Sequence, residues 1–372
     1  MYYHLILTDN CNLCCTYCRG KAFTVDPPEL PDIAVDENLP VDLDIDLDDL
    51  YRFLAKDPGA VLTFYGGEPL LAVDRIREIV RDAPVSALIL HTNGTLLDRL
   101  DHATANRFDT ILVSIDGPEG LTDAHRGRGT FARLTKNLRC LAAGGFAGEV
   151  IARMTVTEDT DIAAAVHYLT ANDRFSFPAV HWQMDANFWN DYEMRDYTTW
   201  VTESYNPGIR DLVAFWVETM REEGRVLRWY PFMDPMQDML LSRPSMLRCG
   251  CGHANYSIMT DGHIAPCPIM VGMKDYYVGH IATADPLRLP VTTVGSPCTE
   301  CGLLDFCGGR CLYSNITRPW PEEGRRVVCG TVENLHRSLS TALPEVRRLI
   351  EAGTVRMEDF DHRKYNSCEI IP

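Results

Sequence analysis

Residues 11–18 read CNLCCTYC and directly follow a short apolar run, Tyr2–Leu7. Cys11, Cys15 and Cys18 have the spacing C-x3-C-x2-C, which places three thiolates on one tight loop. A [4Fe-4S] cluster normally takes four thiolates, so a loop of three leaves one iron open to an outside chelator. The alternative for three close cysteines is a zinc knuckle.

The chain around this loop alternates between short apolar runs and helical patterns. Strands are predicted at Tyr2–Leu7, Val61–Tyr65, Ala87–His91, Thr110–Ile115, Val150–Val156 and Ala179–Met184. Helical patterns lie between them at Asp74–Arg81, Phe131–Ala143 and Asp161–Ala171. Six β/α units in a row predict an α/β fold with a parallel sheet, curled into a partial (β/α)6 TIM-like barrel. In such barrels the chemistry takes place at the carboxyl ends of the strands.

Polar motifs stand at the ends of the next three predicted strands. They read Tyr65-Gly66-Gly67-Glu68-Pro69, Thr92-Asn93-Gly94, and Ser114-Ile115-Asp116-Gly117-Pro118 followed by Arg126. Glycines permit close approach of a backbone, and a carboxylate can hold an ammonium group by a charge-assisted bond. Each motif alone is also a common turn. Four successive strand ends carrying them in order favour one shared site.

Together the cysteine loop and these motifs resemble the radical S-adenosylmethionine (SAM) family. The resemblance implies that the open iron holds the amino and carboxylate groups of SAM, and that Tyr17 packs near its adenine. It also implies that Glu68 holds the methionine ammonium group and that Arg126 pairs with the SAM carboxylate. The implied SAM contacts are Tyr17, Gly66, Gly67, Glu68, Thr92, Asn93, Ser114, Asp116 and Arg126.

Eight further cysteines fall between residues 249 and 329. They are Cys249, Cys251, Cys267, Cys298, Cys301, Cys307, Cys311 and Cys329. Their spacing, with Gly262 before Cys267 and then C-x2-C-x5-C-x3-C, resembles the SPASM extension of radical SAM enzymes, which holds two auxiliary [4Fe-4S] clusters. The alternative is a pair of structural zinc sites, which also use sets of four thiolates.

The SPASM resemblance implies an outer cluster on Cys298, Cys301, Cys307 and Cys329. It implies that Cys311 crosses over to an inner cluster with Cys267 and the upstream cysteines. The C-x-C at Cys249 and Cys251 is tighter than in sulfatase-maturating relatives. Either both bind the inner cluster, or one binds and the other leaves a site open for substrate.

The length of 372 residues suggests a large domain with a smaller companion. We predict a radical SAM barrel at 1–195, a helical bridge at 196–244 that contains a helix over Thr198–Glu223, and a SPASM domain at 245–372. The last long helix is predicted over Val332–Ile350. The barrel contains an acidic insertion at 22–51, expected to be a solvated loop, with a lid or a docking surface for a basic partner as the alternative. Its run Val41–Asp48 alternates apolar and acidic residues and suggests a short edge strand.

A net charge of −17 disfavours nucleic acid as a partner. No apolar run approaches the roughly 20 residues that span a bilayer, so no membrane partner is expected. The N-terminus lacks the features of a signal peptide, and the chain is predicted to be cytoplasmic, where thiols stay reduced and metal ligation is the better explanation for fourteen cysteines. Cys140 is expected to be a buried apolar thiol and Cys368 an idle one.

The implied activity is reductive cleavage of SAM to a 5'-deoxyadenosyl radical, followed by oxidation of a peptide or protein side chain, with a one-electron donor such as ferredoxin or flavodoxin. The alternatives are oxidation of a small metabolite, or a multicluster electron carrier without catalysis. No leader-binding domain is expected before Cys11. Pro268 stands where sulfatase-maturating relatives have a proton-accepting Asp, which weakens that activity. His181, Asp185 and His253 are acid–base candidates, each expected to be structural instead.

Overall fold

The computed structural model describes residues 1–18 and 33–366. The chain divides into two compact units. The first contains residues 1–152, 249–293 and 365–367, and the second contains 153–248, 294–364 and 368–372. The three domains expected from the sequence remain a prediction. Within the described residues, no helix has the length and apolar character needed to cross a bilayer.

The first unit is built on a largely parallel sheet. Its strands are β1 (Tyr2–Thr8), β2 (Val61–Gly66), β3 (Ala87–Thr92), β4 (Thr110–Ser114), β8 (Asn255–Ile258), β9 (His263–Ala265) and β10 (Gly279–His280). They lie in the order β10-β9-β8-β1-β2-β3-β4. β8, β1, β2, β3 and β4 are parallel to one another, whereas β9 is antiparallel to β8 and β10 is antiparallel to β9. β5 (Glu149–Val156) then carries the chain from the first unit into the second.

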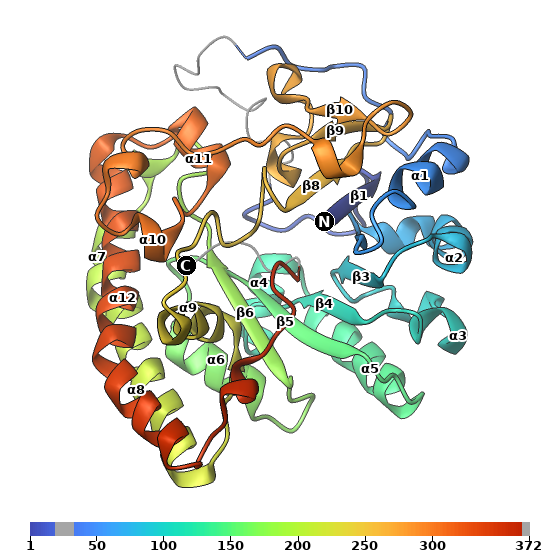
Figure 1. Ribbon diagram of the computed structural model, residues 1–372. Coiled ribbons are helices and arrows are strands. Elements are labelled where there is room, and N and C mark those ends of the chain that lie inside the picture. The colour runs from blue at the N-terminus through green and yellow to red at the C-terminus, as the bar shows by residue number, and fades with distance from the viewer. Residues whose placement is uncertain (19–32, 367–372) are drawn as a thin grey trace. The chain divides into compact units, whose positions relative to one another are not determined.

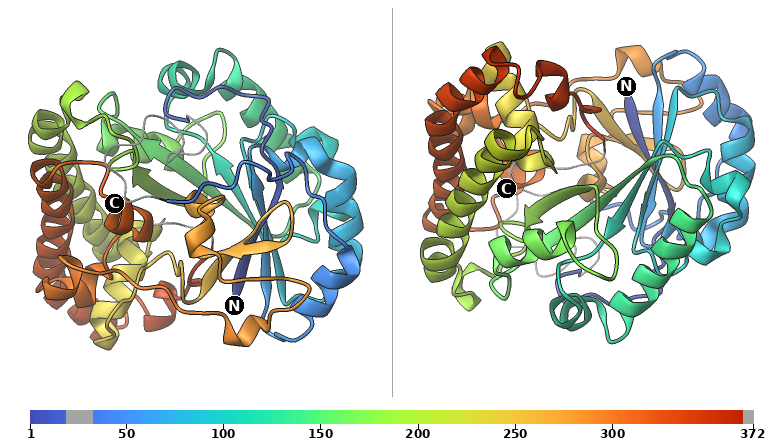
Figure 2. Two further views of the ribbon diagram at one scale, coloured as in Figure 1. Left: turned by 90° about the horizontal axis from the view of Figure 1, so that it is seen from above. Right: turned by 90° about the horizontal axis from the view of Figure 1, so that it is seen from below.

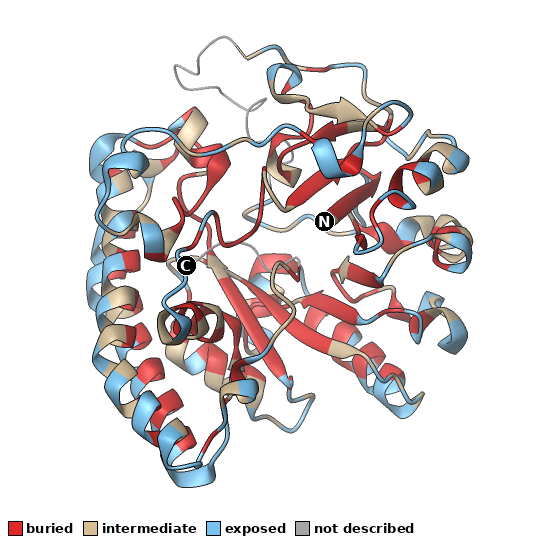
Figure 3. Cartoon of the chain, viewed as in Figure 1, coloured by how far each residue is buried: buried red, intermediate tan, exposed pale blue. Residues whose placement is uncertain are grey.

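The helices of the first unit follow its strands. They are α1 (Leu47–Leu54), α2 (Val73–Asp82), α3 (His102–Ala105), α4 (Glu119–Arg126) and α5 (Thr130–Ala143). α1, α2 and α3 lie along the outer side of β1 to β4 (Figures 1 and 2). With helices on the sheet, β1, β2, β3 and β4 are buried along almost their whole length (Figure 3), which explains why each was recognised as an apolar run.

The second unit is mainly helical. Its elements are α6 (Ile162–Thr170), β6 (Ala179–Met184), α7 (Tyr197–Trp200), α8 (Asn206–Glu223), β7 (Arg228–Trp229), α9 (Tyr230–Leu241), α10 (Leu304–Cys307), α11 (Leu312–Thr317) and α12 (Glu322–Glu351). α8 and α12 run side by side (Figure 1), joined by hydrogen bonds from Arg210 to Asn334 and from Arg221 to Glu345. β6 and β7 pair in parallel.

Two expectations about the acidic insertion and Cys140 were wrong. Val41–Asp48 forms no strand: Asp42 makes one isolated bridge with Thr8, and α1 begins at Leu47, where Asp46 accepts a hydrogen bond from the Asp48 amide and caps the helix. The insertion's residues 22–32 lie outside the described residues, as does Cys368. Cys140 is exposed, because it falls on the solvent side of α5 rather than on its buried face.

Candidate active site and auxiliary cysteine sites

Two glycines bring the end of β2 against the start of the cysteine loop. The Gly67 amide donates to the Thr8 carbonyl at 2.8 Å, and the Glu68 amide donates to the Asn10 carbonyl at 2.9 Å. A Cβ atom on Gly66 would lie 2.3 Å from the Thr8 oxygen, and one on Gly67 would lie 2.2 Å from the Asn10 oxygen. Only glycine therefore fits at either position, and this close approach fixes the backbone one residue before Cys11.

The carboxylate of Glu68 joins the end of β2 to the end of β3. Its side chain is fully buried and accepts hydrogen bonds from the Leu70 amide at 3.0 Å, the Thr92 hydroxyl at 2.7 Å and the Asn93 amide at 2.7 Å. Burial raises the pKa of Glu68, and the three donors offset part of that rise. The predicted contact of Glu68 with the SAM ammonium group stays a prediction, since these three bonds are made within the protein.

Asn93 links the end of β3 to the cysteine loop. Its side-chain amide donates to the Asn12 carbonyl oxygen at 2.9 Å and approaches the Cys11 sulfur at 3.9 Å. Asn12 in turn donates to the Thr95 hydroxyl at 2.9 Å. Asn12 and Thr95 were not predicted as site residues, although both lie within two positions of motif residues. The cysteine loop is thus held at the strand ends, as the barrel rule predicts.

The end of β4 holds the other side of the loop through a buried ion pair. Arg126 donates from Nε and Nη2 to the two carboxylate oxygens of Asp116, each at 2.8 Å. Tyr17 donates to Asp116 at 3.1 Å, and its ring lies 5.5 Å from the Arg126 guanidinium carbon. Burial alone would raise the pKa of Asp116, but the charge of Arg126 holds this pKa below its ordinary value. Tyr17, Asp116 and Arg126 therefore form one group, and their predicted contacts with SAM remain predictions.

His125 completes this group and was missed in the sequence. It is buried, lies 3.3 Å from the Asp116 carboxylate through Nδ1, and packs edge-on against Tyr17 at 5.6 Å. Its carbonyl accepts from the Thr16 amide at 2.9 Å, inside the cysteine loop. In the sequence, only its position next to Arg126 could have identified it as a site residue. Ser114 lies half-buried at the last position of β4.

The three loop cysteines lie near one another and form a donor set suited to a metal cluster. Burial raises the pKa of Cys11, and it raises the pKa of Cys15 to about 11. The nearby cysteines add to both rises, since adjacent thiolates repel. Thiols of this kind lose their protons when iron binds. Three of them on one loop fit a four-iron cluster with one open iron.

The upstream auxiliary cysteines converge within the first unit. Cys249, Cys251 and Cys267 are buried, and hydrogen bonds to Cys249 and Cys267 raise the pKa of Cys251 well above its ordinary value. The Gly250 carbonyl between the two cysteines accepts from the Ala254 and Asn255 amides at 2.8 and 2.7 Å, and this turn leads into β8. All three sulfurs are therefore within reach of one another. Among residues 1–18 and 33–366, no three His, Cys, Asp or Glu side chains are grouped tightly enough to hold a single metal ion.

The downstream cysteines share one cavity within the second unit. The cavity has a volume of about 540 Å³, and its walls include Cys298, Cys301, Cys307, Cys311 and Cys329. Burial raises the pKa of Cys298 and Cys329, and raises that of Cys307 to about 11. Asn315 donates to the Cys298 sulfur at 3.5 Å and was not predicted. Four of these cysteines are the predicted ligands of the outer cluster, and Cys311 is a predicted ligand of the inner one. The donor set suits an iron–sulfur cluster, and the assignment of each cysteine to a cluster stays a prediction.

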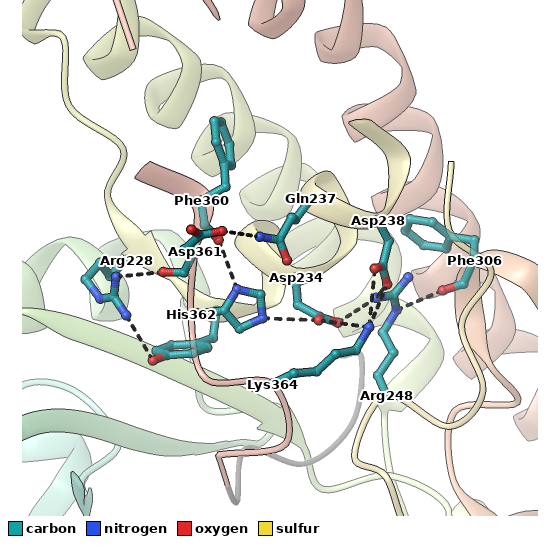
Figure 4. A network of polar contacts seen from close by, with 11 residues as sticks. Arg228, Asp234, Gln237, Asp238, Arg248, Phe306, Phe360, Asp361, His362 and Lys364 are labelled. Carbon is teal, nitrogen blue, oxygen red and sulfur yellow. Dashed lines mark hydrogen bonds and ion pairs between the residues drawn. The ribbon is translucent and has the colours of Figure 1, made fainter. Parts of the chain in front are cut away.

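Arg248, the residue before Cys249, belongs to a buried polar network in the second unit (Figure 4). Its guanidinium donates to Asp234 at 2.5 Å, to Asp238 at 2.9 Å and to the Phe306 carbonyl at 2.8 Å. His362 lies 3.2 Å from Asp234. The network joins three parts of the second unit, namely α9, α10 (through the Phe306 carbonyl) and the segment 360–364.

The three acid–base candidates have partners of their own. Asp185 accepts from Arg195 at 3.4 Å, and Arg195 also binds Glu158 at 2.8 Å. His253 lies 3.3 Å from the Cys251 carbonyl and 3.4 Å from the Tyr365 hydroxyl. His181 is buried within β6. A catalytic role for any of them stays untested.

Residues 5–167 match the radical SAM superfamily. Residues 5–167 form a radical SAM domain. Such a domain binds SAM and a [4Fe-4S] cluster, and the mixed α/β fold with its parallel sheet is the radical SAM fold.

Curated relatives divide by how much of the chain they match. Pre-heme d1 synthase of Dinoroseobacter shibae is 33% identical over 165 residues, 42% of this chain and 36% of that protein. The mycofactocin maturase MftC of Mycobacterium ulcerans is 25% identical over 350 residues, 87% of this chain and 86% of that protein. The first similarity is confined to less than half of the chain, whereas the second extends beyond the radical SAM domain.

Solved structures share the fold along nearly the whole chain. Native anSMEcpe with bound AdoMet has a TM-score of 0.68 at 19% identity and covers 95% of this chain and 99% of its own. A second structure of anSMEcpe, with AdoMet and the Cp18Cys peptide, has a TM-score of 0.65 at 19% identity and covers 94% and 98%. At this identity the likeness establishes the fold.

Proposed function

We propose that this radical SAM enzyme cleaves SAM reductively and uses the resulting radical to oxidise a side chain of a peptide or protein. Cys11, Cys15 and Cys18 hold the SAM-cleaving cluster, and the cysteines from Cys249 to Cys329 hold two auxiliary clusters. The observation that carries the proposal is the fixing of the cysteine loop to the ends of β2, β3 and β4 by Glu68, Asn93 and the Asp116–Arg126 pair.

The chemistry that the bound cluster and SAM supply is cleavage of SAM to methionine and a 5'-deoxyadenosyl radical, which removes a hydrogen atom from the substrate. The protein's part is orientation and the exclusion of water. Asn93 and Asn12 hold the loop on the β3 side, and Tyr17 holds it on the β4 side. The charge of Arg126 favours an anion beside the loop, and the SAM carboxylate is one.

Net oxidation requires the substrate radical to lose an electron and a proton. The auxiliary cysteine sites supply an electron acceptor on this proposal. Pro268 follows Cys267 directly at the start of a short 3-10 turn and has no proton to exchange. On this proposal the proton leaves by another group, which weakens the case for a sulfatase-maturating activity.

A peptide substrate is favoured by the extent of the similarities. The likeness to the maturase MftC spans 350 residues, 87% of this chain, whereas the likeness to pre-heme d1 synthase spans 165, 42% of it. A small-metabolite substrate remains the second candidate because of the latter similarity. A crosslink, a thioether and a dehydrogenation are the three product types we propose, and a ferredoxin or flavodoxin is the electron donor.

The experiment is mass spectrometry of a short peptide encoded beside this gene, after anaerobic incubation with the enzyme, SAM and a strong reductant. The proposal predicts a peptide that has lost two hydrogen atoms. The matched control is the enzyme with Cys11, Cys15 and Cys18 changed to Ala, which leaves the peptide unchanged. If no polypeptide is altered while a small metabolite is consumed together with SAM, the peptide proposal fails and the radical SAM domain stands.

A further inference from the structure

A buried arginine lines the cavity of the downstream cysteines. Arg310 stands in the sequence Cys307-Gly308-Gly309-Arg310-Cys311 and is only 7% exposed. Among the described residues, its Nε and Nη2 atoms have no hydrogen-bond partner, and no ion pair joins it to an acidic side chain. Burying two guanidinium nitrogens without a partner is unfavourable, so an anion in the cavity would be stabilised beside this group.

The backbone places Arg310 in the cavity at a conformational penalty. Arg310 has φ +53°, in the left-handed region that disfavours a side chain, and it follows two glycines with φ +70° and +92°. The segment Gly308–Arg310 is held in place by a hydrogen bond in which the Leu247 amide donates to the Gly308 carbonyl at 2.9 Å. A Cβ atom on Gly308 would lie 2.4 Å from the Leu247 nitrogen, so glycine is required there. Strain of this kind marks residues held for a function.

The acidic side chains at the cavity do not neutralise Arg310. Glu322 forms an ion pair with Arg326, and Glu333 is exposed. Other groups that share the cavity with Arg310 are cysteines, namely Cys298, Cys301, Cys307, Cys311 and Cys329. Two buried phenols, Tyr197 and Tyr205, also lie within its electrostatic reach and carry no charge.

A four-iron cluster with four thiolate ligands is an anion, and it becomes more negative when it is reduced. We propose that Arg310 is the counter-charge of the auxiliary cluster held by Cys298, Cys301, Cys307 and Cys329, and that it raises the reduction potential of this cluster. Net charge, hydrogen bonds to sulfur and solvent exposure set such potentials, and a buried cation acts through the first of these. The inference rests on the proposed auxiliary clusters and assigns Arg310 a positioning role: it makes this cluster a better acceptor for the substrate's electron.

The test is a potentiometric titration of the anaerobic holoenzyme followed by electron paramagnetic resonance, with total iron measured alongside. The auxiliary signal is assigned by its loss in Cys301→Ser. In Arg310→Met at full iron content, we expect the ratio of reduced to oxidised cluster at a fixed potential to fall about tenfold, which corresponds to 59 mV for a one-electron couple. Arg310→Lys keeps the charge and should restore most of the wild-type potential.

Arg326→Met is the matched control. Arg326 lines the same cavity, but its side chain is 78% exposed and already paired with Glu322, so its removal should leave the potential unchanged. An unchanged potential in Arg310→Met at full iron content overturns the inference. If Arg310→Met loses the cluster, the Arg310→Lys variant decides the question. A wild-type cluster potential in Arg310→Lys supports the role of the charge, whereas loss of the cluster in Arg310→Lys as well overturns the inference. If the wild-type protein binds only about four irons, the proposal of auxiliary clusters is wrong, and the role inferred for Arg310 fails with it.

Discussion

At the scale of single residues, the pair of Asp116 and Arg126 defines the β4 side of the site. Both side chains are at least 94% buried, so loss of one partner leaves the other as an uncompensated charge. We expect Arg126→Gln or Asp116→Asn to lower the free energy of unfolding by about 3–5 kcal/mol. Denaturant unfolding of the anaerobic protein measures this loss.

The double variant Asp116→Asn with Arg126→Gln separates stability from SAM binding. It removes both charges, so we expect it to recover most of the lost stability. It still lacks the guanidinium proposed to favour the SAM carboxylate, so SAM affinity should stay weak. Recovery of wild-type SAM affinity in the double variant would show that the pair is only structural.

Gly67 tests the contact between β2 and the cysteine loop. A methyl group there would lie 2.2 Å from the Asn10 oxygen, whereas one on Gly120, in α4, meets nothing within 4 Å. We expect Gly67→Ala to displace the loop and lose about four irons on reconstitution, and Gly120→Ala to be neutral or stabilising by roughly 0.5–1 kcal/mol. Iron analysis of the two variants distinguishes them, and full iron in Gly67→Ala would disprove the proposed role.

At the scale of elements, the network around Asp234 joins α9 to the segment 360–364 (Figure 4). Burial alone would raise the pKa of Asp234. The hydrogen bond from His362 and the charge of Arg248 instead hold this pKa well below its ordinary value. Burial alone would lower the pKa of His362, but Asp234 raises it above its ordinary value. The pair is therefore fully formed from above the ordinary Asp range, about pH 4, to the ordinary His value, about pH 6.5.

This pair predicts a pH-dependent stability. The contribution of His362 is complete below about pH 6.5 and is lost as the pH rises through its higher folded pKa. We expect the melting temperatures of the wild type and His362→Gln to differ most near pH 5.5 and to converge in alkali. A difference that stays constant across this range would mean that the charge of His362 is irrelevant to stability.

The sequence predicted local elements better than distant partners. All six predicted strands formed within one residue of their expected ends, since each apolar run is buried along its length. α12 begins ten residues earlier than expected: Gly324 and Gly330 weaken the helical signal, but Gly324 packs against Tyr192, where a Cβ atom would lie 2.7 Å from the ring. No local pattern shows that β8 pairs with β1, because the two are more than 240 residues apart.

For the site too, the sequence predicted local features better than contacts between distant residues. Motif spacing found the residues at the ends of β2, β3 and β4, because each motif is local. It did not show that Asp116 occupies two nitrogens of Arg126, nor that Arg310 is buried without a partner in the described protein. Those facts depend on side chains that meet only after folding.

At the scale of the whole molecule, the cysteine sets predict the metal content. Three four-iron clusters amount to about twelve irons per chain after anaerobic reconstitution. Changing Cys11, Cys15 and Cys18 together to Ala should leave about eight. Zinc in place of iron at Cys249–Cys329, in protein purified without oxygen, would exclude the auxiliary clusters while leaving the radical SAM domain in place.

The central claim is that the loop of Cys11, Cys15 and Cys18 cleaves SAM. The measurement that tests it most directly is the yield of 5'-deoxyadenosine from anaerobically reconstituted protein supplied with SAM and a strong reductant. The account predicts 5'-deoxyadenosine from the wild type and none from the triple Cys-to-Ala variant, which keeps its auxiliary iron. Fully iron-loaded wild-type protein that forms no 5'-deoxyadenosine, or a triple variant that forms as much as the wild type, would contradict it.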